Sequence, residues 1–585
     1  MDIKDILEHT ICSTLTSIFN QKFNEDALII NETRKEFEGD YTLVCFPFSK
    51  LFRKAPPVIA EDIGQALIKT EIFNSYNVVS GFLNLKLSNH IWNKCLNHYS
   101  LNSIVEKNKA TYVVEYSSPN TNKPLHLGHI RNNLLGKAVC NLLKSVGHNV
   151  VETNLVNDRG IHICKSMLAW KKYGSNETPE SSQLKGDHLV GKYYVKFDQI
   201  YKEQIQKGIQ NGQTEKEAKE LAPIMKEARS MLIKWEAGDK EVRALWEQMN
   251  NWVYKGFDET YKRLGISFDK TMYESETYKL GKKAVLAALK KNQCYQKEDQ
   301  SIWIDLKEKG LDDKILLRSD GTSVYITQDI GTAMLRHEEY KMDHSVYVVG
   351  NEQEYHFNVL KESLVQFGQN WANGIHHLSY GMVDLPSGKM KSREGTVVDA
   401  DDLLQEMHET AKSQTLELGK IDAFTSEEAN ELFEVIGLGA LKFFLLKVDP
   451  KKRILFNPEE SIDFQGFTGP FIQYTHARIC SMLSKANDIG IKENIKLGEQ
   501  EITLCIQLFN YKECLLEAAS QMNPAIIANY CFDLSKSFNR YYAAVPILAE
   551  ENEALRNMRL FLCEKITYTL KTGMALLGIK LPNKM

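Results

Sequence analysis

The spacing of apolar residues changes its character three times along the chain. Near the N-terminus apolar residues recur at helical spacing, and then a strand-like run occupies 37–50. A helix signal follows Pro56-Pro57, and a second strand-like run covers 78–87. This mixture predicts a small α+β domain over residues 1–105.

A strand, a loop, a helix and a second strand follow each other directly. Residues 111–120 are rich in β-branched and aromatic side chains and end at Ser-Pro-Asn. Residues 124–146 carry apolar positions at helical spacing up to Gly147, and 149–157 is again β-rich. This order is a βαβ unit, which predicts a parallel sheet.

Long, highly charged helices are predicted from about 171 to about 260, as in 215–236. Such charge runs are usually solvated faces of helices. Because these helices stand between strand-rich segments, we interpret them as an insertion between two halves of an α/β fold. The pattern then returns to strand-like segments at 301–306, 322–330, 344–350 and 378–385. The α/β domain is therefore expected over 106–423, and the helix-periodic remainder, 424–585, predicts an all-α bundle.

Composition narrows the class of protein only slightly. With 585 residues, 43% hydrophobic and 25% charged, the chain fits a soluble globular protein of several domains. Asp2, Asp5 and Glu8 argue against a signal or transit peptide, and no segment could span a bilayer, so a cytoplasmic protein is expected. The net charge of −4 neither indicates nor excludes a nucleic-acid partner. Eleven cysteines without any Cys-x-x-Cys pair predict buried reduced thiols and no zinc or other metal site.

The first motif with chemical meaning is Pro124-Leu-His-Leu-Gly-His129, between a predicted strand and a predicted helix. The N-terminus of a helix favours an anion, and two imidazoles three residues apart can reach the same phosphate. Gly128 leaves room for an adenine or ribose against the backbone. Taken alone, the two histidines are more often surface or capping residues. A zinc site is disfavoured because no third ligand accompanies them.

The second motif is Gly388-Lys-Met-Lys-Ser-Arg-Glu-Gly-Thr396, after another strand-like segment. Glycines on both sides of a basic cluster suit a loop whose cations close over a polyphosphate. Alone it would be interpreted as a basic surface loop. Together and in this order, the two motifs resemble the HIGH and KMSKS signatures of class I aminoacyl-tRNA synthetases.

Further segments narrow the resemblance to the arginyl-tRNA synthetases, and they cover essentially the whole chain. They are residues 115–124, 156–160, Phe268-Asp269, Glu274-Ser275, Tyr325 with Asp329, Gly350 with Gln353 and His356, 468–478 and 581–585. The resemblance implies a Rossmann-type parallel-sheet catalytic domain with a helical insertion. It also implies a small α+β N-terminal domain that binds tRNA and an all-α bundle that binds the anticodon.

The resemblance implies an arginine pocket, and the residue types suit one. A guanidinium seeks carboxylates in bidentate geometry with a ring or hydroxyl nearby. Tyr325 and Asp329 are four apart, so they can face one pocket if a helix begins where the strand-like run ends. By resemblance the guanidinium contacts are Glu274, Tyr325 and Asp329, and the contacts to the amino-acid end are Glu115, Ser118, Asn120, His129 and Gln353.

The resemblance also implies ATP, with Mg²⁺, as a substrate. Its expected contacts are His126, Gly128, His129, Met382, Val383, Lys389 and Ser392. The loop departs from the family signature, because serine stands where KMSKS has its second lysine. In such enzymes a lysine just before HIGH is thought to substitute, which here is Lys123. The expected catalytic residues are therefore His126, His129 and Lys123, with Lys389 and Lys391 as competitors for the transition-state role.

The implied macromolecular partner is an arginine tRNA. Phe82 and Asn84 are expected at its D-loop corner, and Phe471, Tyr474, Arg478, Tyr541 and Met585 at its anticodon. Without the resemblance, Phe471 and Tyr474 would be interpreted as bundle core. The resemblance further implies that bound tRNA precedes arginine activation, and a monomer is expected.

Three other interpretations compete with this one: another class I synthetase, a small nucleotidyltransferase and a non-catalytic paralogue. A cysteinyl enzyme would need zinc cysteines, and a glutamyl or glutaminyl enzyme would need cations in its pocket. A small nucleotidyltransferase with His-x-Gly-His would leave the helical C-terminal region unexplained. The main alternative is a non-catalytic tRNA-binding paralogue, although such proteins usually lose a motif histidine or the bundle.

Overall fold

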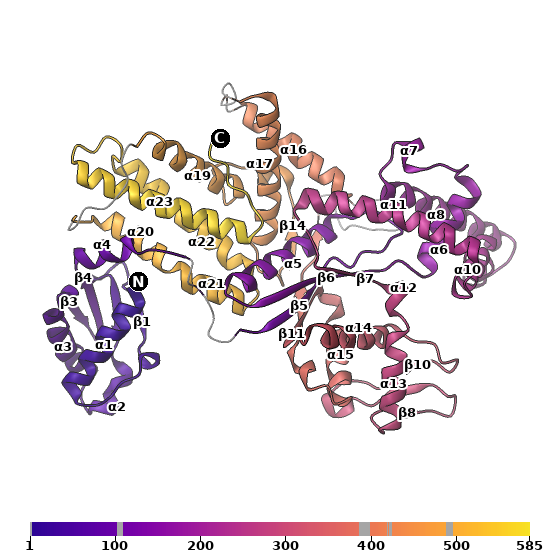
Figure 1. Cartoon of the computed structure of the whole chain (residues 1–585), viewed down its shortest axis with the longest axis horizontal. Coiled ribbons are helices and arrows are strands. Elements are labelled where there is room, and N and C mark those ends of the chain that lie inside the picture. Colours follow the sequence, from indigo (N-terminus) through magenta and orange to yellow (C-terminus); the bar gives the residue numbers. More distant parts are fainter. Residues whose placement is uncertain are drawn as a thin grey trace.

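The computed structural model describes residues 3–101, 104, 109–384, 398–417, 419, 424–486 and 495–585. Three regions follow one another (Figure 1). A small domain of helices and strands lies beside a helical bundle, a parallel sheet occupies the centre, and long helices extend to the far side. No helix among the described residues is long and apolar enough to cross a membrane.

The N-terminal domain packs helices on one antiparallel sheet of order β1-β2-β4-β3. The 78–87 run is the end of one strand and the whole of the next, because Ser80 and Gly81 turn the chain with φ of 57° and 127°. Its elements are α1 (Ile3–Phe19), β1 (Ile30–Glu32), β2 (Tyr41–Val44), α2 (Ser49–Phe52), α3 (Pro56–Leu67), β3 (Phe73–Val79), β4 (Phe82–Leu87) and α4 (Asn89–Asn97).

This domain is anchored on the C-terminal bundle. Asn93 Nδ2 donates a 2.9 Å hydrogen bond to the backbone oxygen of Ile495, and the Tyr99 hydroxyl donates to Leu508 O at 3.2 Å. Trp92 and Tyr99 both pack against the ring of Phe509. Buried hydrogen bonds and shared aromatic packing therefore join the two regions.

The central sheet has five strands in the order β12-β11-β5-β6-β7, and every neighbouring pair is parallel. The predicted βαβ unit is present, with α5 as the crossover between β5 and β6. Gly136 lets α5 approach the sheet, since a Cβ there would lie 2.3 Å from Cγ of Tyr116. The elements are β5 (Thr111–Glu115), α5 (Leu127–Ser145), β6 (Asn149–Val156), β7 (Lys270–Tyr273), β11 (His344–Gly350) and β12 (Ile375–Tyr380).

The charged insertion is helical, as predicted. The run 215–236 is two helices, because Pro223 lacks a backbone N–H and forces Ala222 out of helical geometry, with ψ of 122°. The helices are α6 (Ile161–Tyr173), α7 (Pro179–Ser182), α8 (Gly186–Gln210), α9 (Glu215–Leu221), α10 (Pro223–Glu236) and α11 (Lys240–Leu264).

One strand expected from the sequence is wrong. Residues 322–330 mostly form the start of α14 (Tyr325–Tyr340) rather than a strand. Its packing decides this: α14 lies so close to the preceding helix that a Cβ on Gly281 would come 1.6 Å from the backbone oxygen of Thr327. Tertiary packing of this kind overrides the β propensity of a short run such as Thr322–Ile326.

The rest of the second half surrounds α14. The run 378–385 is divided, since β12 ends at Tyr380 and Val383–Asp384 pairs instead with Ile454–Leu455. The remaining elements are α12 (Glu274–Thr277), α13 (Leu280–Lys290), β8 (Tyr295–Gln296), β9 (Ile302–Ile304), β10 (Lys314–Leu317), α15 (Glu354–Gln366) and β13 (Val383–Asp384).

Among its described residues, the regular structure of the C-terminal region is helical except for one short strand, as predicted. The eleven cysteines of the whole chain are free thiols, and nine of them are buried. The elements are α16 (Ala400–Glu417), α17 (Ser426–Leu446), β14 (Ile454–Leu455), α18 (Pro458–Ser461), α19 (Gly469–Leu483), α20 (Glu499–Phe509), α21 (Tyr511–Ser520), α22 (Pro524–Ala544) and α23 (Glu553–Leu576).

Candidate active site

The carboxyl ends of the parallel strands place most of the predicted site residues at one edge of the sheet. The loop after β5 carries Ser118, Asn120 and the first motif, and the chain after β6 carries Asp158. Glu274 follows β7 directly, and Gln353 follows β11. Residues far apart in sequence therefore converge because the strands that precede them run in the same direction.

His126 and His129 cap the N-terminus of α5 reciprocally. Nδ1 of His126 accepts from the Gly128 N–H at 3.1 Å, and Nδ1 of His129 accepts from the His126 N–H at 3.1 Å. The two rings lie 3.9 Å apart. A neutral imidazole whose Nδ1 accepts carries its proton on Nε2, so both rings present an Nε2–H donor.

Both imidazoles remain neutral at physiological pH. Burial, together with the nearby Lys123 ammonium, lowers the pKa of His126 to about 4. Burial and the neighbouring His126 hold the pKa of His129 well below its ordinary value. Burial also lowers the pKa of Lys123. The end of α5 thus combines two neutral donors, one lysine and a helix N-terminus, which suits a polyphosphate.

The loop between β5 and α5 is held in a strained form. Ser117 and Ser118 have φ of 76° and 44°, in the left-handed region that costs energy for residues other than glycine. The Ser117 N–H donates to Asn132 Oδ1 at 2.5 Å, and the Ser118 N–H to Asn154 Oδ1 at 3.0 Å. Two buried amide side chains therefore impose this backbone.

Glu115, at the end of β5, is buried. It forms an ion pair with Arg336 at 2.5 Å and accepts from the Ser118 hydroxyl at 3.1 Å. Arg336 is only 1% exposed, so the pair is largely shielded from water. Glu115 and Ser118 are thus in direct contact.

The expected guanidinium contacts are brought onto two neighbouring helices. Tyr325 is the first residue of α14 and is 78% exposed, and Asp329 lies one helical turn further on. Asp329 Oδ2 lies 2.6 Å from Nε2 of His356. Glu274 begins α12, and burial raises its pKa to about 6. The helix that was expected to bring Tyr325 and Asp329 onto one face therefore begins at Tyr325.

The second motif lies outside the described residues, and with it Lys389, Lys391 and Ser392. Just before it, Met382 is 42% exposed, whereas the side chain of Val383 is buried. Just after it, Leu127 N donates to Val398 O at 3.2 Å and Ala400 N donates to Leu125 O at 3.0 Å. The chain after the second motif is therefore tied by backbone hydrogen bonds to the first motif.

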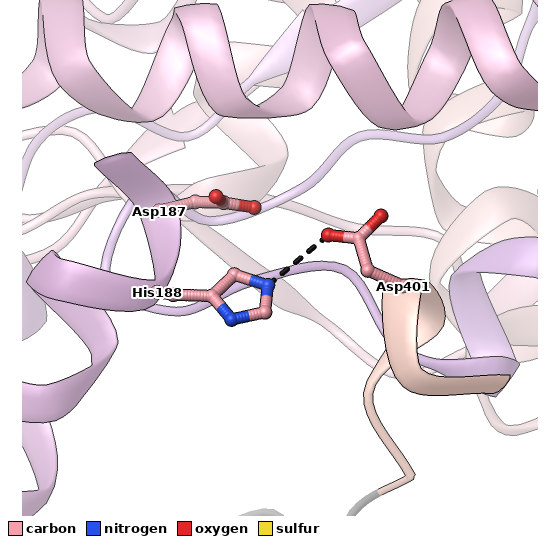
Figure 2. A group of neighbouring side chains, drawn as sticks. All are labelled: Asp187, His188 and Asp401. Carbon is pink, nitrogen blue, oxygen red and sulfur yellow. Dashed lines mark hydrogen bonds and ion pairs between the residues drawn. The ribbon is translucent and has the colours of Figure 1, made fainter. Parts of the chain in front are cut away.

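The next residue along, Asp401, belongs to a charged cluster with Asp187 and His188 of α8 (Figure 2). One ligand atom from each of the three lies within 4.8 Å of the others. His188 Nε2 lies 3.1 Å from Asp401, and this hydrogen bond raises the pKa of His188. These side chains would suit a metal cation, but the ammonium group of Lys185 already provides the positive charge at this place.

Lys185 forms ion pairs with Asp187, at 3.3 Å, and with Asp401. Thr260 of α11 donates to Asp401 at 2.9 Å. Although burial alone would raise the pKa of Asp401, bonds from His188 and Lys185 hold it well below its usual range. The cluster is thus an ion-pair network that joins α8, α11 and the start of α16.

The expected tRNA contacts of the N-terminal domain separate into two kinds. Phe82 is 40% exposed and packs edge-on against the exposed ring of Phe46 at 5.1 Å. Asn84 is only 2% exposed, and its Oδ1 accepts from the Thr42 hydroxyl at 2.7 Å. The expectation for Asn84 is corrected, because its side chain is buried against Thr42 and is not exposed to a partner.

The anticodon expectation needs one correction of helical register. Tyr541 is 1% exposed and its hydroxyl donates to Glu501, so it belongs to the bundle core. The next residue, Tyr542, is 42% exposed, and the Arg478 guanidinium lies 5.4 Å from its ring and 4.8 Å from that of Tyr474. Sequence reasoning missed Tyr542, although the spacing of apolar residues in α22 would place it on the outer face.

The other two expected anticodon residues, Phe471 and Met585, are partly buried. Phe471 is partly buried against Phe532, 5.2 Å away, so it packs within the bundle as well as lining its face. Met585 also packs partly buried against the core. His476 and Gln473 of α19 bond the backbone oxygens of Pro582 and Lys580, which fixes the C-terminal segment against α19.

Comparison with known proteins agrees with this arrangement throughout the chain. The family model described as "tRNA synthetases class I (R), catalytic domain" matches residues 91–457. The models for "DALR anticodon binding domain" and "Arginyl tRNA synthetase N terminal domain" match 472–585 and 3–87.

Relatives with these names match over their full length. The arginine–tRNA ligase of Bacteroides thetaiotaomicron is 53% identical over 597 residues, covering 100% of both chains, and that of Flavobacterium psychrophilum is 50% identical with the same coverage. The solved structure of the Thermus thermophilus arginyl-tRNA synthetase superposes with a TM-score of 0.80 at 27% identity, covering 100% of both chains.

The matched family model and the full-length relatives identify the chain as a class I aminoacyl-tRNA synthetase, in agreement with the capped histidine pair at the carboxyl edge of the parallel sheet. The expected Rossmann-type catalytic domain, small N-terminal domain and helical bundle are confirmed. Within that class, the chain belongs to the arginyl-tRNA synthetase family.

Proposed function

We propose that the chain activates L-arginine with ATP and transfers it to an arginine tRNA, releasing AMP and pyrophosphate. The observation that carries the proposal is the pair of neutral, reciprocally capped histidines at the strand edge that also holds Glu274 and Gln353. ATP enters with Mg²⁺ on its phosphate oxygens, as part of the substrate. The alternative function, a non-catalytic tRNA-binding paralogue, has no use for this arrangement.

In the activation step the arginine carboxylate attacks the α-phosphate, and the bond to pyrophosphate breaks. Negative charge grows on the phosphate oxygens, where the Nε2–H groups of His126 and His129 donate. The Lys123 ammonium adds the charge that a lysine in the second motif supplies elsewhere, with Lys389 and Lys391 as competitors. Loss of one such donor costs roughly 10²–10³ in rate.

The remaining ATP contacts follow from the same placement. Gly128 lets the His126 ring lie against the helix end, since a Cβ there would come 3.0 Å from Cε1 of His126, and Met382 is exposed beside the second motif. Val383 contributes through its backbone, because its side chain is buried, and Ser392 completes the set.

Selection of arginine is assigned to Glu274, Asp329 and Tyr325. A guanidinium that meets two carboxylates makes charge-assisted hydrogen bonds, which a neutral side chain of similar shape cannot form. Glu115, Ser118, Asn120, His129 and Gln353 are assigned to the α-amino and carboxylate end of the substrate.

Transfer then takes place to the terminal adenosine of the tRNA through its 2′-hydroxyl. We assign the anticodon contacts to Phe471, Tyr474, Arg478, Tyr542 and Met585, and the D-loop corner to Phe82. The units are 1–105 for the tRNA corner, 106–423 for catalysis and 424–585 for the anticodon. We further propose a cytoplasmic monomer that activates arginine only with tRNA bound.

ATP–pyrophosphate exchange tests this proposal directly. Exchange is expected with arginine and an arginine tRNA transcript together, and to be absent when the tRNA is omitted. Exchange that needs no tRNA would refute the tRNA requirement alone. Exchange with another amino acid would refute the assignment of Glu274 and Asp329, and tRNA binding without any exchange would establish the paralogue.

A further inference from the structure

The segment after β6 is hydrogen-bonded to the start of α12 through one buried carboxylate. Asp158 is 1% exposed. Its Oδ1 accepts from the Ser275 N–H at 2.9 Å, and its Oδ2 accepts from the Ser275 hydroxyl at 2.7 Å and from the Tyr254 hydroxyl at 3.1 Å. Two of the three bonds therefore end on a single residue, the one that follows Glu274.

The backbone of Asp158 is fixed as firmly as its side chain. Its carbonyl oxygen accepts from Trp246 Nε1 at 2.6 Å and from Asn250 Nδ2 at 3.2 Å, both on α11. Asp158 is therefore held by the insertion on one side and holds Ser275 on the other. Such a group moves little and can transmit its position to its partner.

The next residue, Arg159, extends the same contact to Glu274 itself. Its guanidinium Nη1 lies 3.9 Å from Glu274 Oε1, and its guanidinium carbon lies 4.0 Å above the ring of Tyr278. Arg159 also donates to Glu236 at 2.8 Å. The two consecutive residues after Asn157 thus contact both residues that open α12.

We propose that Asp158 is a positioning residue for arginine recognition: by binding Ser275 through both its N–H and its hydroxyl, it fixes Glu274 where the substrate guanidinium must meet it. The inference rests on the proposed role of Glu274. Glu274 sits on a helix of only four residues, which has too few internal hydrogen bonds to hold its own orientation. Asp158 supplies the missing constraint.

The measurement that tests this is the KM for arginine in tRNA-dependent ATP–pyrophosphate exchange, over a double-mutant cycle of D158N and E274Q. Asn keeps the shape of Asp158 but turns one acceptor into a donor, so it cannot accept from both Ser275 groups. D158N is expected to raise the KM for arginine roughly 10-fold, and E274Q roughly 30-fold or more. In the E274Q background D158N is expected to add less than about 2-fold, because the group that it positions is gone.

Citrulline distinguishes positioning from a general loss of structure. It is the neutral isostere of arginine, so its inhibition constant should change less than about 2-fold in D158N while the KM for arginine rises. The KM for ATP should also stay within about 2-fold. Equal weakening of arginine and citrulline would mean that D158N disturbs the whole pocket and would overturn the inference.

Two further outcomes are decisive, and a second variant covers the case in which D158N does not fold. If E274Q leaves the KM for arginine unchanged, the proposed role of Glu274 itself fails. If E274Q raises it but D158N has the same effect in both backgrounds, Glu274 stands and the inference fails. If D158N does not fold, S275A carries the test: it deletes only the hydroxyl bond and should raise the KM roughly 3-fold. E276Q, one position along on the exposed side of α12, is the matched control and should leave it unchanged.

Discussion

Replacement of His126 separates its structural role from its chemical one. As the N-cap of α5, His126 accepts from Gly128 N, and its own N–H is bonded by His129, each at 3.1 Å. Asparagine caps helices as well as any residue, whereas alanine does not. H126N therefore keeps the cap and loses the Nε2–H donor, and H126A loses both.

The two losses differ in size. Removing the cap costs about 1 kcal/mol of stability. Removing a donor to the developing charge costs roughly 10²–10³ in the rate of activation, which is about 2.7–4 kcal/mol in the barrier. H126N should thus unfold like the wild type, and H126A should be less stable by about 1 kcal/mol. Both should lose activity to the same extent.

Activity is measured as single-turnover formation of arginyl-adenylate with tRNA present. Stability is measured as the free energy of urea unfolding of the catalytic domain, followed spectroscopically. Because the donor is a neutral imidazole, the defect should be constant across neutral pH. If H126N retains activity within about 5-fold of the wild type, the imidazole is only a cap and the reasoning about its Nε2–H is wrong.

Other parts of the site give three shorter predictions. Glu274 has a pKa of about 6, so the KM for arginine should rise as the pH falls below that value, by about 10-fold per pH unit, and E274Q should abolish the dependence. Y542A should weaken tRNA binding by about 1–3 kcal/mol in a filter-binding assay, whereas Y541F should leave tRNA binding unchanged. Weaker binding by Y541F than by Y542A would instead support the original assignment of Tyr541 to the anticodon. G281A should destabilise the protein by at least about 2 kcal/mol in urea unfolding, because its Cβ would meet the Thr327 oxygen at 1.6 Å, and a stable variant would contradict that packing.

Local signals determined much of the fold in advance. The βαβ unit was predictable because its strands are β-rich, its helix has a clear period and Gly147 ends it. The helix at Tyr325 was not, since its first residues favour a strand and a long-range contact with Gly281 decides their form. Periodicity carries no information about such contacts.

The site shows the same division. His126 and His129 could be found because their motif is contiguous, but their neutral state depends on reciprocal capping and burial that only the folded chain reveals. His188 and Asp401 lie 213 positions apart, and nothing in either sequence segment indicates that they are in contact. Asp158 was recognised within a motif, yet its partner Ser275 became apparent only in three dimensions.

The hydrogen bonds between the N-terminal domain and the bundle set the distance between the two proposed tRNA-binding surfaces. Asn93 and Tyr99 bond the bundle directly, so the surface around Phe82 and the surface around Tyr474 belong to one continuous body. Their separation is set by protein packing rather than by a linker. A tRNA whose corner and anticodon lie a different distance apart would fit only one of the two proposed surfaces at a time, so we expect the overall shape of the tRNA to contribute to its selection.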